Sequence, residues 1–148
     1  MPDLLSSEAD GVLTLTFNRP ASFNAMTDEM SDGFASAMES CAGRDEVRVV
    51  VITGAGDAFN AGADISGADA HERFDVRALD RANRMVRAVV SCPVPVVAAV
   101  NGIAAGVGCS IALAADLTVA SSSASFLLAF ARVGLMPDGG ATALVAAS

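Results

Sequence analysis

Two short segments rich in β-branched residues restrict the possible folds of this chain more than any other feature. The first covers residues 47–53 and has three valines and an isoleucine in succession at residues 49–52, and the second covers residues 96–100. An apolar run without polar alternation is typical of a strand buried on both faces, as in a parallel sheet. Because parallel strands are usually joined through helices, these segments predict an α/β fold.

Further strands and helices are expected along the rest of the chain, separated by glycine-rich or polar connections. Met26, Met30, Phe34, Met38 and Cys41 recur every three or four residues, which predicts a helix with one buried apolar stripe. We expect strands at 12–17, 117–120 and 124–128, helices at 27–43, 75–90, 109–115 and from 137 to 148, a loop at 54–66, a polar mobile segment at 67–74 and a tight turn at 102–108.

The helix expected to end at residue 90 also has a predicted orientation. Leu79, Val86 and Val90 are expected to face the core. Asp80 and Arg84 are four residues apart and are predicted to form an ion pair on the solvent side.

The charge balance excludes several classes of function. Seventeen acidic residues oppose nine basic ones, so the net charge is −8. A chain this acidic lacks the basic face that binds nucleic acid, so no nucleic-acid partner is expected. All basic residues are arginine, and the absence of lysine excludes a P-loop that binds nucleotide phosphates.

Cysteine usage and hydropathy indicate a protein of the cytoplasm. Cys41, Cys92 and Cys109 form no ligand pattern with each other or with histidine, so we expect reduced thiols and no metal site. Residues 93–115 lack formal charge over a length that could span a bilayer, but they contain two prolines and three glycines. A buried strand, turn and helix explain this stretch better than a membrane span.

Two glycine-rich loops follow the buried strands, at residues 54–56 and 102–108. Such loops expose backbone N–H groups that can bind an anion or a developing negative charge, although they can also be simple packing turns. The first loop does not complete the dinucleotide-binding pattern GxGxxG, because Phe59 occupies the place of the third glycine. A Rossmann site is therefore not expected.

Four motifs in register resemble the enoyl-CoA hydratase/isomerase (crotonase) superfamily. They are FNRP and FNA within residues 17–25, AGADI at 61–65, AAVNG and GVG within 98–108, and GLMPDGG at 134–140. The resemblance implies a crotonase-like (ClpP/crotonase) spiral of ββα units that binds acyl-CoA thioesters as a homotrimer or hexamer. It implies no cofactor other than the coenzyme A of the substrate. It also implies that residues 1–148 are the truncated core of a domain whose C-terminal helical part is absent.

The resemblance assigns an oxyanion hole to two backbone groups. By similarity, the N–H groups of Ala63 and Val107 stabilise the enolate oxygen of the thioester. Oriented N–H donors in a dry site are suited to this charge, with about 3–4 kcal/mol per donor in comparable sites. The resemblance also implies contacts with the substrate from Phe23, Ala25, Ala61, Asp64, Ile65, Ile103, Phe130 and Pro137.

The acid–base residues distinguish between possible reactions. Hydratases of this family use two glutamates, at positions that correspond here to Ser110 and Phe130, and hydration requires two proton-transferring groups. Asp138 is retained, and one carboxylate suffices to move a proton between the α and γ carbons of an enoyl-CoA. We therefore expect an isomerase with Asp138 as the proton shuttle. The alternatives are an enoyl-CoA hydratase, or a non-catalytic acyl-CoA-binding or assembly subunit.

Several single residues have a structural interpretation beside the functional one. Asp138 could cap the helix that follows it. Asp64 is expected to organise its loop or to lie near the CoA adenine, and Asp116 to end a helix or make a buried hydrogen bond. Ser66 replaces a lysine that is common in the family, whereas an arginine from residues 73–87 could meet a CoA phosphate. His71 is expected to be a solvated surface residue.

Overall fold

The computed structural model of this chain describes residues 1–66 and 75–147. The predicted polar mobile segment at 67–74, which includes His71, lies outside the described residues. Among those described, no helix combines the length and the apolar composition that crossing a bilayer would require.

Parallel strands form two sheets that alternate along the chain. The larger sheet has the order β1-β2-β3-β5-β7, in which β1 is antiparallel to β2 and the other pairs are parallel. The smaller sheet has the order β4-β6-β8 and is parallel. The strands are β1 (Leu4–Ala9), β2 (Val12–Phe17), β3 (Val49–Gly54), β4 (Ala58–Asn60), β5 (Val96–Val100), β6 (Ile103–Ala105), β7 (Leu117–Ala120) and β8 (Ser125–Leu127).

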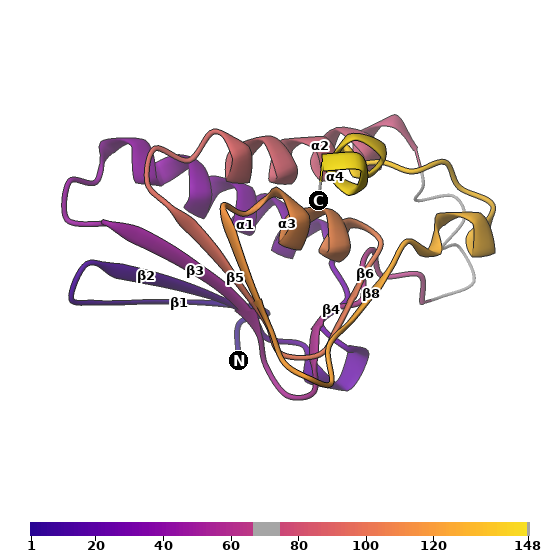
Figure 1. Cartoon of the computed structure of the whole chain (residues 1–148), viewed down its shortest axis with the longest axis horizontal. Coiled ribbons are helices and arrows are strands. Elements are labelled where there is room, and N and C mark those ends of the chain that lie inside the picture. The colour runs from indigo at the N-terminus through magenta and orange to yellow at the C-terminus, as the bar shows by residue number, and fades with distance from the viewer. Residues whose placement is uncertain (67–74, 148) are drawn as a thin grey trace.

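A strand from each sheet followed by a helix is the repeating unit of the fold. The helices are α1 (Asp28–Ser40), α2 (Val76–Val90), α3 (Val107–Ala114) and α4 (Ala141–Ala147). The unit recurs as β3-β4-α2, β5-β6-α3 and β7-β8-α4. Figure 1 shows α1, α2 and α3 on one face of the larger sheet, with the smaller sheet to the side. This arrangement confirms the predicted α/β spiral of ββα units.

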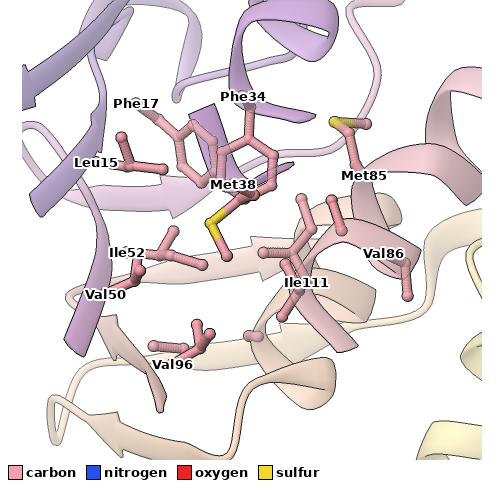
Figure 2. Close-up of a cluster of buried hydrophobic side chains, with 14 of the residues drawn as sticks. Leu15, Phe17, Phe34, Met38, Val50, Ile52, Met85, Val86, Val96 and Ile111 are labelled. Carbon is pink, nitrogen blue, oxygen red and sulfur yellow. The ribbon is translucent and has the colours of Figure 1, made fainter. Parts of the chain in front are cut away.

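The core lies between the larger sheet and the helices. Figure 2 shows side chains from β2, β3 and β5 meeting side chains from α1, α2 and α3. The rings of Phe17 and Phe34 lie 5.3 Å apart between their centroids, which joins β2 to α1. The predicted apolar stripe is buried: Met30, Phe34 and Met38 lie in α1, and Met26 and Cys41, which flank the helix, are buried too.

Helix α2 faces the core with a different set of residues from the one predicted. Val86 is buried as expected, but Leu79 and Val90 are 46% and 63% exposed. Ala82, Met85, Ala88 and Val89 fill the interface instead. Small residues such as Ala82 and Ala88 let neighbouring helices approach each other closely. The prediction considered only the large apolar side chains.

The predicted pairing of Asp80 with Arg84 is also wrong. Arg84 reaches across to α1, where its Nη2 lies 2.7 Å from Glu39 Oε2. The ion pair therefore joins two helices rather than two turns of one helix.

The strand pattern differs from the prediction in three respects. Strand β1 at Leu4–Ala9 was not predicted. Val49 and Val51 are only partly buried, because the helices cover one face of the larger sheet. The short strands β4 and β6 fall within segments that were expected to be a loop and a turn. Three residues beside glycines give too little periodicity for a strand to be predicted.

Candidate functional site

Two glycines hold the predicted site loops against each other. Gly62 has a φ of +89° and Gly106 a φ of +52°, a region of backbone conformation that favours glycine. A Cβ atom at Gly62 would lie only 2.9 Å from the carbonyl oxygen of Ala105 and 3.5 Å from the Cα of Gly106. The backbones of the two loops can therefore approach this closely only because residue 62 has no side chain.

The N–H groups that follow these glycines have no partner among the described residues. Val107 is the first residue of α3, so its N–H precedes the helical hydrogen-bond pattern. Ala63 forms a parallel bridge with Met26, but the bonds of this bridge use the carbonyl of Gly62 and the N–H of Asp64. Both Ala63 and Val107 therefore keep a free donor, and both line one pocket.

Two buried asparagines fix the geometry of the Gly62 loop. The Asn60 Oδ1 accepts a hydrogen bond of 2.9 Å from the Gly62 N–H, and its Nδ2 donates to the carbonyl of Asn24 at 2.7 Å. The Asn24 Nδ2 in turn donates to the carbonyl of Ala58 at 2.7 Å. Asn60 is not among the site residues predicted from the sequence. Its position at the end of β4 was the only signal, and that strand was not predicted.

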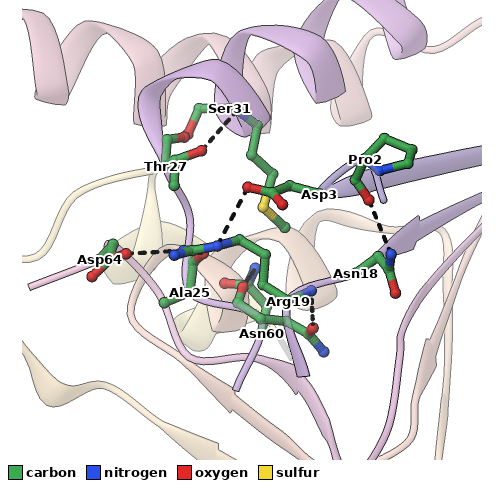
Figure 3. Close-up of polar contacts among 11 residues, drawn as sticks. Pro2, Asp3, Asn18, Arg19, Ala25, Thr27, Ser31, Asn60 and Asp64 are labelled. Atoms are coloured by element: carbon green, nitrogen blue, oxygen red, sulfur yellow. Dashed lines mark hydrogen bonds and ion pairs between the residues drawn. The ribbon is translucent and has the colours of Figure 1, made fainter. Parts of the chain in front are cut away.

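Asp64 bonds within its own loop, in keeping with one of the two roles expected from the sequence. Figure 3 shows its carboxylate facing Arg19, whose Nη1 donates to Asp64 Oδ2 at 2.9 Å and to the carbonyl of Ala25 at 2.6 Å. The Asp64 Oδ1 accepts from the N–H of Ser66 at 2.9 Å. Hydrogen bonds from Ser66 and Arg19 lower the pKa of Asp64 to about 2. Its carboxylate is thus ionised and fully occupied in holding the loop.

The pocket in front of the free N–H groups has a volume of about 570 Å³. Its walls are mainly apolar and come from the Gly62 loop, α2, the start of α3 and the segment after β8. The apolar side chains include Met26, Ile65, Val76, Leu79, Met85, Val107, Phe130, Leu135 and Met136. Such a cavity, with a few polar groups aimed into it, is typical of a site for a small organic ligand.

The predicted site residues fall into two groups. Ala61, Ala63, Ile65, Val107, Phe130, Pro137 and Asp138 line the pocket. Phe23, Ala25, Asp64 and Ile103 lie outside its lining: the first three belong to the segments joined by Arg19, and Ile103 begins β6.

Asp138 is half-buried and lines the pocket. Its Oδ1 is buried and has no hydrogen-bond partner among the described residues. Burial raises the pKa of Asp138 above its ordinary value, and its own backbone N–H opposes this shift only in part. The carboxylate does not cap α4, because this helix begins at Ala141 and the Ala141 N–H donates to the backbone carbonyl of Asp138.

Two other carboxylates at the pocket are already engaged. Asp28 lies 3.0 Å from Arg81 Nη1, and Asp75 caps the first turn of α2 and pairs with Arg77. Among the described residues, no group of three or more His, Cys, Asp or Glu side chains could hold a metal ion. Asp138 is therefore the described pocket carboxylate that has a buried oxygen without a partner. The arrangement suits proton transfer beside an oxygen that develops negative charge.

Comparison with known proteins agrees with this geometry. Residues 7–148 match the family model described as Enoyl-CoA hydratase/isomerase. The chain is 42% identical to a Rhodobacter capsulatus protein named Probable enoyl-CoA hydratase, over 90% of this chain and 52% of that protein. It is 38% identical to the 1,2-epoxyphenylacetyl-CoA isomerase of Escherichia coli, over 98% of this chain and 57% of that protein.

A solved structure has the same fold. The crystal structure of an enoyl-CoA hydratase from Mycobacterium avium subsp. paratuberculosis superposes with a TM-score of 0.91 and 49% identity, over 99% of this chain and 56% of the other. The chain thus spans about half the length of the curated relatives it matches.

Proposed function

Because this chain belongs to the enoyl-CoA hydratase/isomerase family, we propose that it acts on an acyl-CoA thioester as an enoyl-CoA isomerase. The thioester oxygen accepts hydrogen bonds from the N–H groups of Ala63 and Val107. The acyl chain occupies the apolar pocket beside Phe130 and Met85. Coenzyme A enters as part of the substrate, and no separate cofactor is needed.

The two N–H donors would supply the electrostatic part of the catalysis. Removal of a proton from the α carbon leaves negative charge on the thioester oxygen, and fixed donors stabilise that charge without reorganising. Helix α3 begins at Val107, so the positive end of its dipole adds to the same effect. The contact between Gly62 and Gly106 holds both donors in place before the substrate arrives.

The free carboxylate of Asp138 is the observation on which the isomerase proposal rests. A base must accept a proton from the α carbon and return it to the γ carbon, and one carboxylate can do both. Burial raises the pKa of Asp138, which makes its ionised form a stronger base than an exposed aspartate. The name of the Escherichia coli relative, an isomerase, agrees with this class of reaction.

Hydration of an enoyl-CoA is the second candidate, because the Rhodobacter capsulatus relative is named a hydratase. Ser110 and Phe130 occupy the positions at which hydratases have glutamates, and neither can activate water as a carboxylate does. Asp28 and Asp75, the other pocket carboxylates, are held by arginines. The polar groups at the pocket thus favour isomerisation.

We further propose a homotrimer or hexamer in the cytoplasm, as the family resemblance and the cysteine usage predict. Exposed apolar side chains on β7 and β8 support an assembly that covers them, namely Leu117, Val119 and Phe126.

Incubation with two substrates tests the proposed reaction. A 3-enoyl-CoA should be converted to the 2-enoyl-CoA, whereas crotonyl-CoA should not gain water at a comparable rate. Rapid hydration of crotonyl-CoA would favour the hydratase instead. Binding of both thioesters without turnover would favour a non-catalytic acyl-CoA-binding or assembly subunit.

A further inference from the structure

Two buried oxygen atoms near the base of the pocket have no hydrogen-bond partner. They are Ser110 Oγ and Asp138 Oδ1. Ser110 belongs to α3 and is fully buried, and its side chain is not part of the pocket lining. A buried hydroxyl and a buried carboxylate each lose their hydrogen bonds to water, so both need a partner inside the protein.

The chain brings these two residues together through Gly139. A Cβ atom at Gly139 would lie 3.2 Å from the Cβ of Ser110 and 3.3 Å from its Oγ. Gly139 also has a φ of +55°, so both its conformation and its surroundings favour glycine. The turn that presents Asp138 to the pocket therefore packs directly on the hydroxyl of Ser110.

The hydroxyl of Ser110 is not used as helix serines commonly are. In α1, Ser31 Oγ donates to the carbonyl of Thr27 at 2.8 Å, and Ser40 Oγ donates to the carbonyl of Ala37 at 2.7 Å. These bonds to the preceding turn satisfy a helical hydroxyl locally. Ser110 makes no such bond, so its donor is free to serve a group outside α3.

We propose that Ser110 is a positioning residue for Asp138, with its hydroxyl donating to the carboxylate through one bridging water molecule. The inference rests on the proposed function, since it assigns Asp138 the part of the base. A donor to the charged form favours ionisation, so Ser110 counteracts the effect of burial on this carboxylate. It also fixes one oxygen, which leaves the other to face the substrate carbon.

Charged groups around the pocket do not replace this donor. Helix α1 contributes Asp28, and α2 contributes Asp75 and Arg81. The Arg81 guanidinium is paired with Asp28 and Asp32. In α3, Cys109 is the titratable neighbour of Ser110, and burial raises the pKa of its thiol. The described part of α4 contains no charged residue.

Titration of the Asp138 carboxyl carbon by ¹³C NMR tests the proposal without relying on turnover. The signal is assigned by its loss in Asp138→Asn. In Ser110→Ala the midpoint should move upward by about 0.5–1 pH unit, because the charged form loses a donor. Ser110→Cys keeps a weak donor in a somewhat larger side chain, so in a folded variant its midpoint should lie between those of the wild type and Ser110→Ala.

Cys109→Ala is the matched control, because it also removes one buried heavy atom from α3 next to Ser110. It should leave the Asp138 midpoint unchanged. An unchanged midpoint in both folded Ser110 variants would overturn the inference, as would an equal shift in Cys109→Ala. Failure of the proposed function is a separate outcome: an Asp138→Asn protein that still isomerises 3-enoyl-CoA would refute the base, whatever the Ser110 variants show.

Discussion

The loop that holds Asp64 and the loop that holds Asp138 each bring a carboxylate to the region of the pocket, with opposite surroundings. Asp64 receives hydrogen bonds from Arg19 and Ser66, and its pKa falls to about 2. Asp138 has an oxygen without a partner, and burial raises its pKa. The pKa values of these two aspartates thus shift in opposite directions, because Asp64 is surrounded by hydrogen-bond donors and Asp138 by apolar side chains.

This difference separates structural from chemical roles. A carboxylate that is fully hydrogen-bonded stabilises the loop that contains it and has little capacity to exchange a proton. A buried carboxylate without partners has a raised pKa. Its ionised form destabilises the folded state and is a stronger base. The N–H groups of Ala63 and Val107 are likewise without partners and available for chemistry. The other polar groups of the loop around Ala63 are hydrogen-bonded and hold its structure.

The largest expected effect comes from Asp138→Asn. Asparagine has the same size and cannot accept a proton, so kcat for isomerisation of 3-enoyl-CoA should fall by about 10³-fold, within the usual range for loss of a general base. KM should change little. Steady-state kinetics on the folded variant measure both, with Asp64→Asn as the matched control. If Asp64→Asn lowers kcat as much as Asp138→Asn does, the assignment of a structural role to Asp64 and a chemical role to Asp138 is wrong.

A smaller loss is expected when one N–H donor is removed. Ala63→Pro lacks the donor but keeps the bridge to Met26, which uses the carbonyl of Gly62 and the N–H of Asp64. We expect kcat/KM to fall by about 10²-fold, as for single donors in similar sites. Ala63→Gly keeps the N–H and should stay within a few-fold of the wild type. Equal activity in the two variants would remove this N–H from the mechanism.

Asp64→Asn should affect stability more than chemistry. The folded pKa of about 2 lies below the ordinary 3.8, so ionised Asp64 stabilises the fold above that ordinary value by about 2 kcal/mol. This contribution is lost as the pH falls through the folded pKa. Urea unfolding at neutral pH should show the loss, and the gap to wild type should narrow toward pH 2. An equal loss in the exposed variant Asp45→Asn would contradict this role.

The smallest effect is on the stability of Asp138→Asn. Because the folded pKa of Asp138 is raised, the native state binds its proton more tightly than the unfolded chain does, and stability falls as the pH rises through that range. The neutral amide removes this cost, so the melting temperature of the variant at neutral pH should be slightly above that of the wild type. A clear decrease would indicate that hydrogen-bond partners stabilise the ionised carboxylate by more than its burial costs.

The fold could be predicted further than the site. The spacing from Met26 to Cys41 was sufficient for the buried face of α1, because a regular helix converts spacing directly into direction. The buried face of α2 could not be predicted in this way, because Ala82 and Ala88 enter the interface and Leu79 does not. Small residues give no hydrophobic signal even where they allow helices to approach.

The site depends on contacts that no local pattern encodes. The motifs indicated Ala63 and Val107 by resemblance, but their proximity follows from the packing of Gly62 on Ala105 and Gly106. Asn60 holds its loop through Asn24, 36 residues earlier, as well as through Gly62. The role proposed for Ser110 likewise depends on Asp138, far along the chain. The surroundings of Asp138 are apolar, because Phe130, Leu135 and Met136 line the same pocket.

Proton transfer between the substrate carbons tests the central claim most directly. When 3-enoyl-CoA is incubated with the protein in D₂O and followed by NMR, the wild type should form 2-enoyl-CoA. The γ carbon should carry deuterium only in those turnovers in which protonated Asp138 exchanges with solvent before it returns the proton. Asp138→Asn should bind the thioester without forming 2-enoyl-CoA, whereas Asp64→Asn should form it as the wild type does. Formation of 2-enoyl-CoA by folded Asp138→Asn at the wild-type rate would contradict the assignment of Asp138 as the proton shuttle.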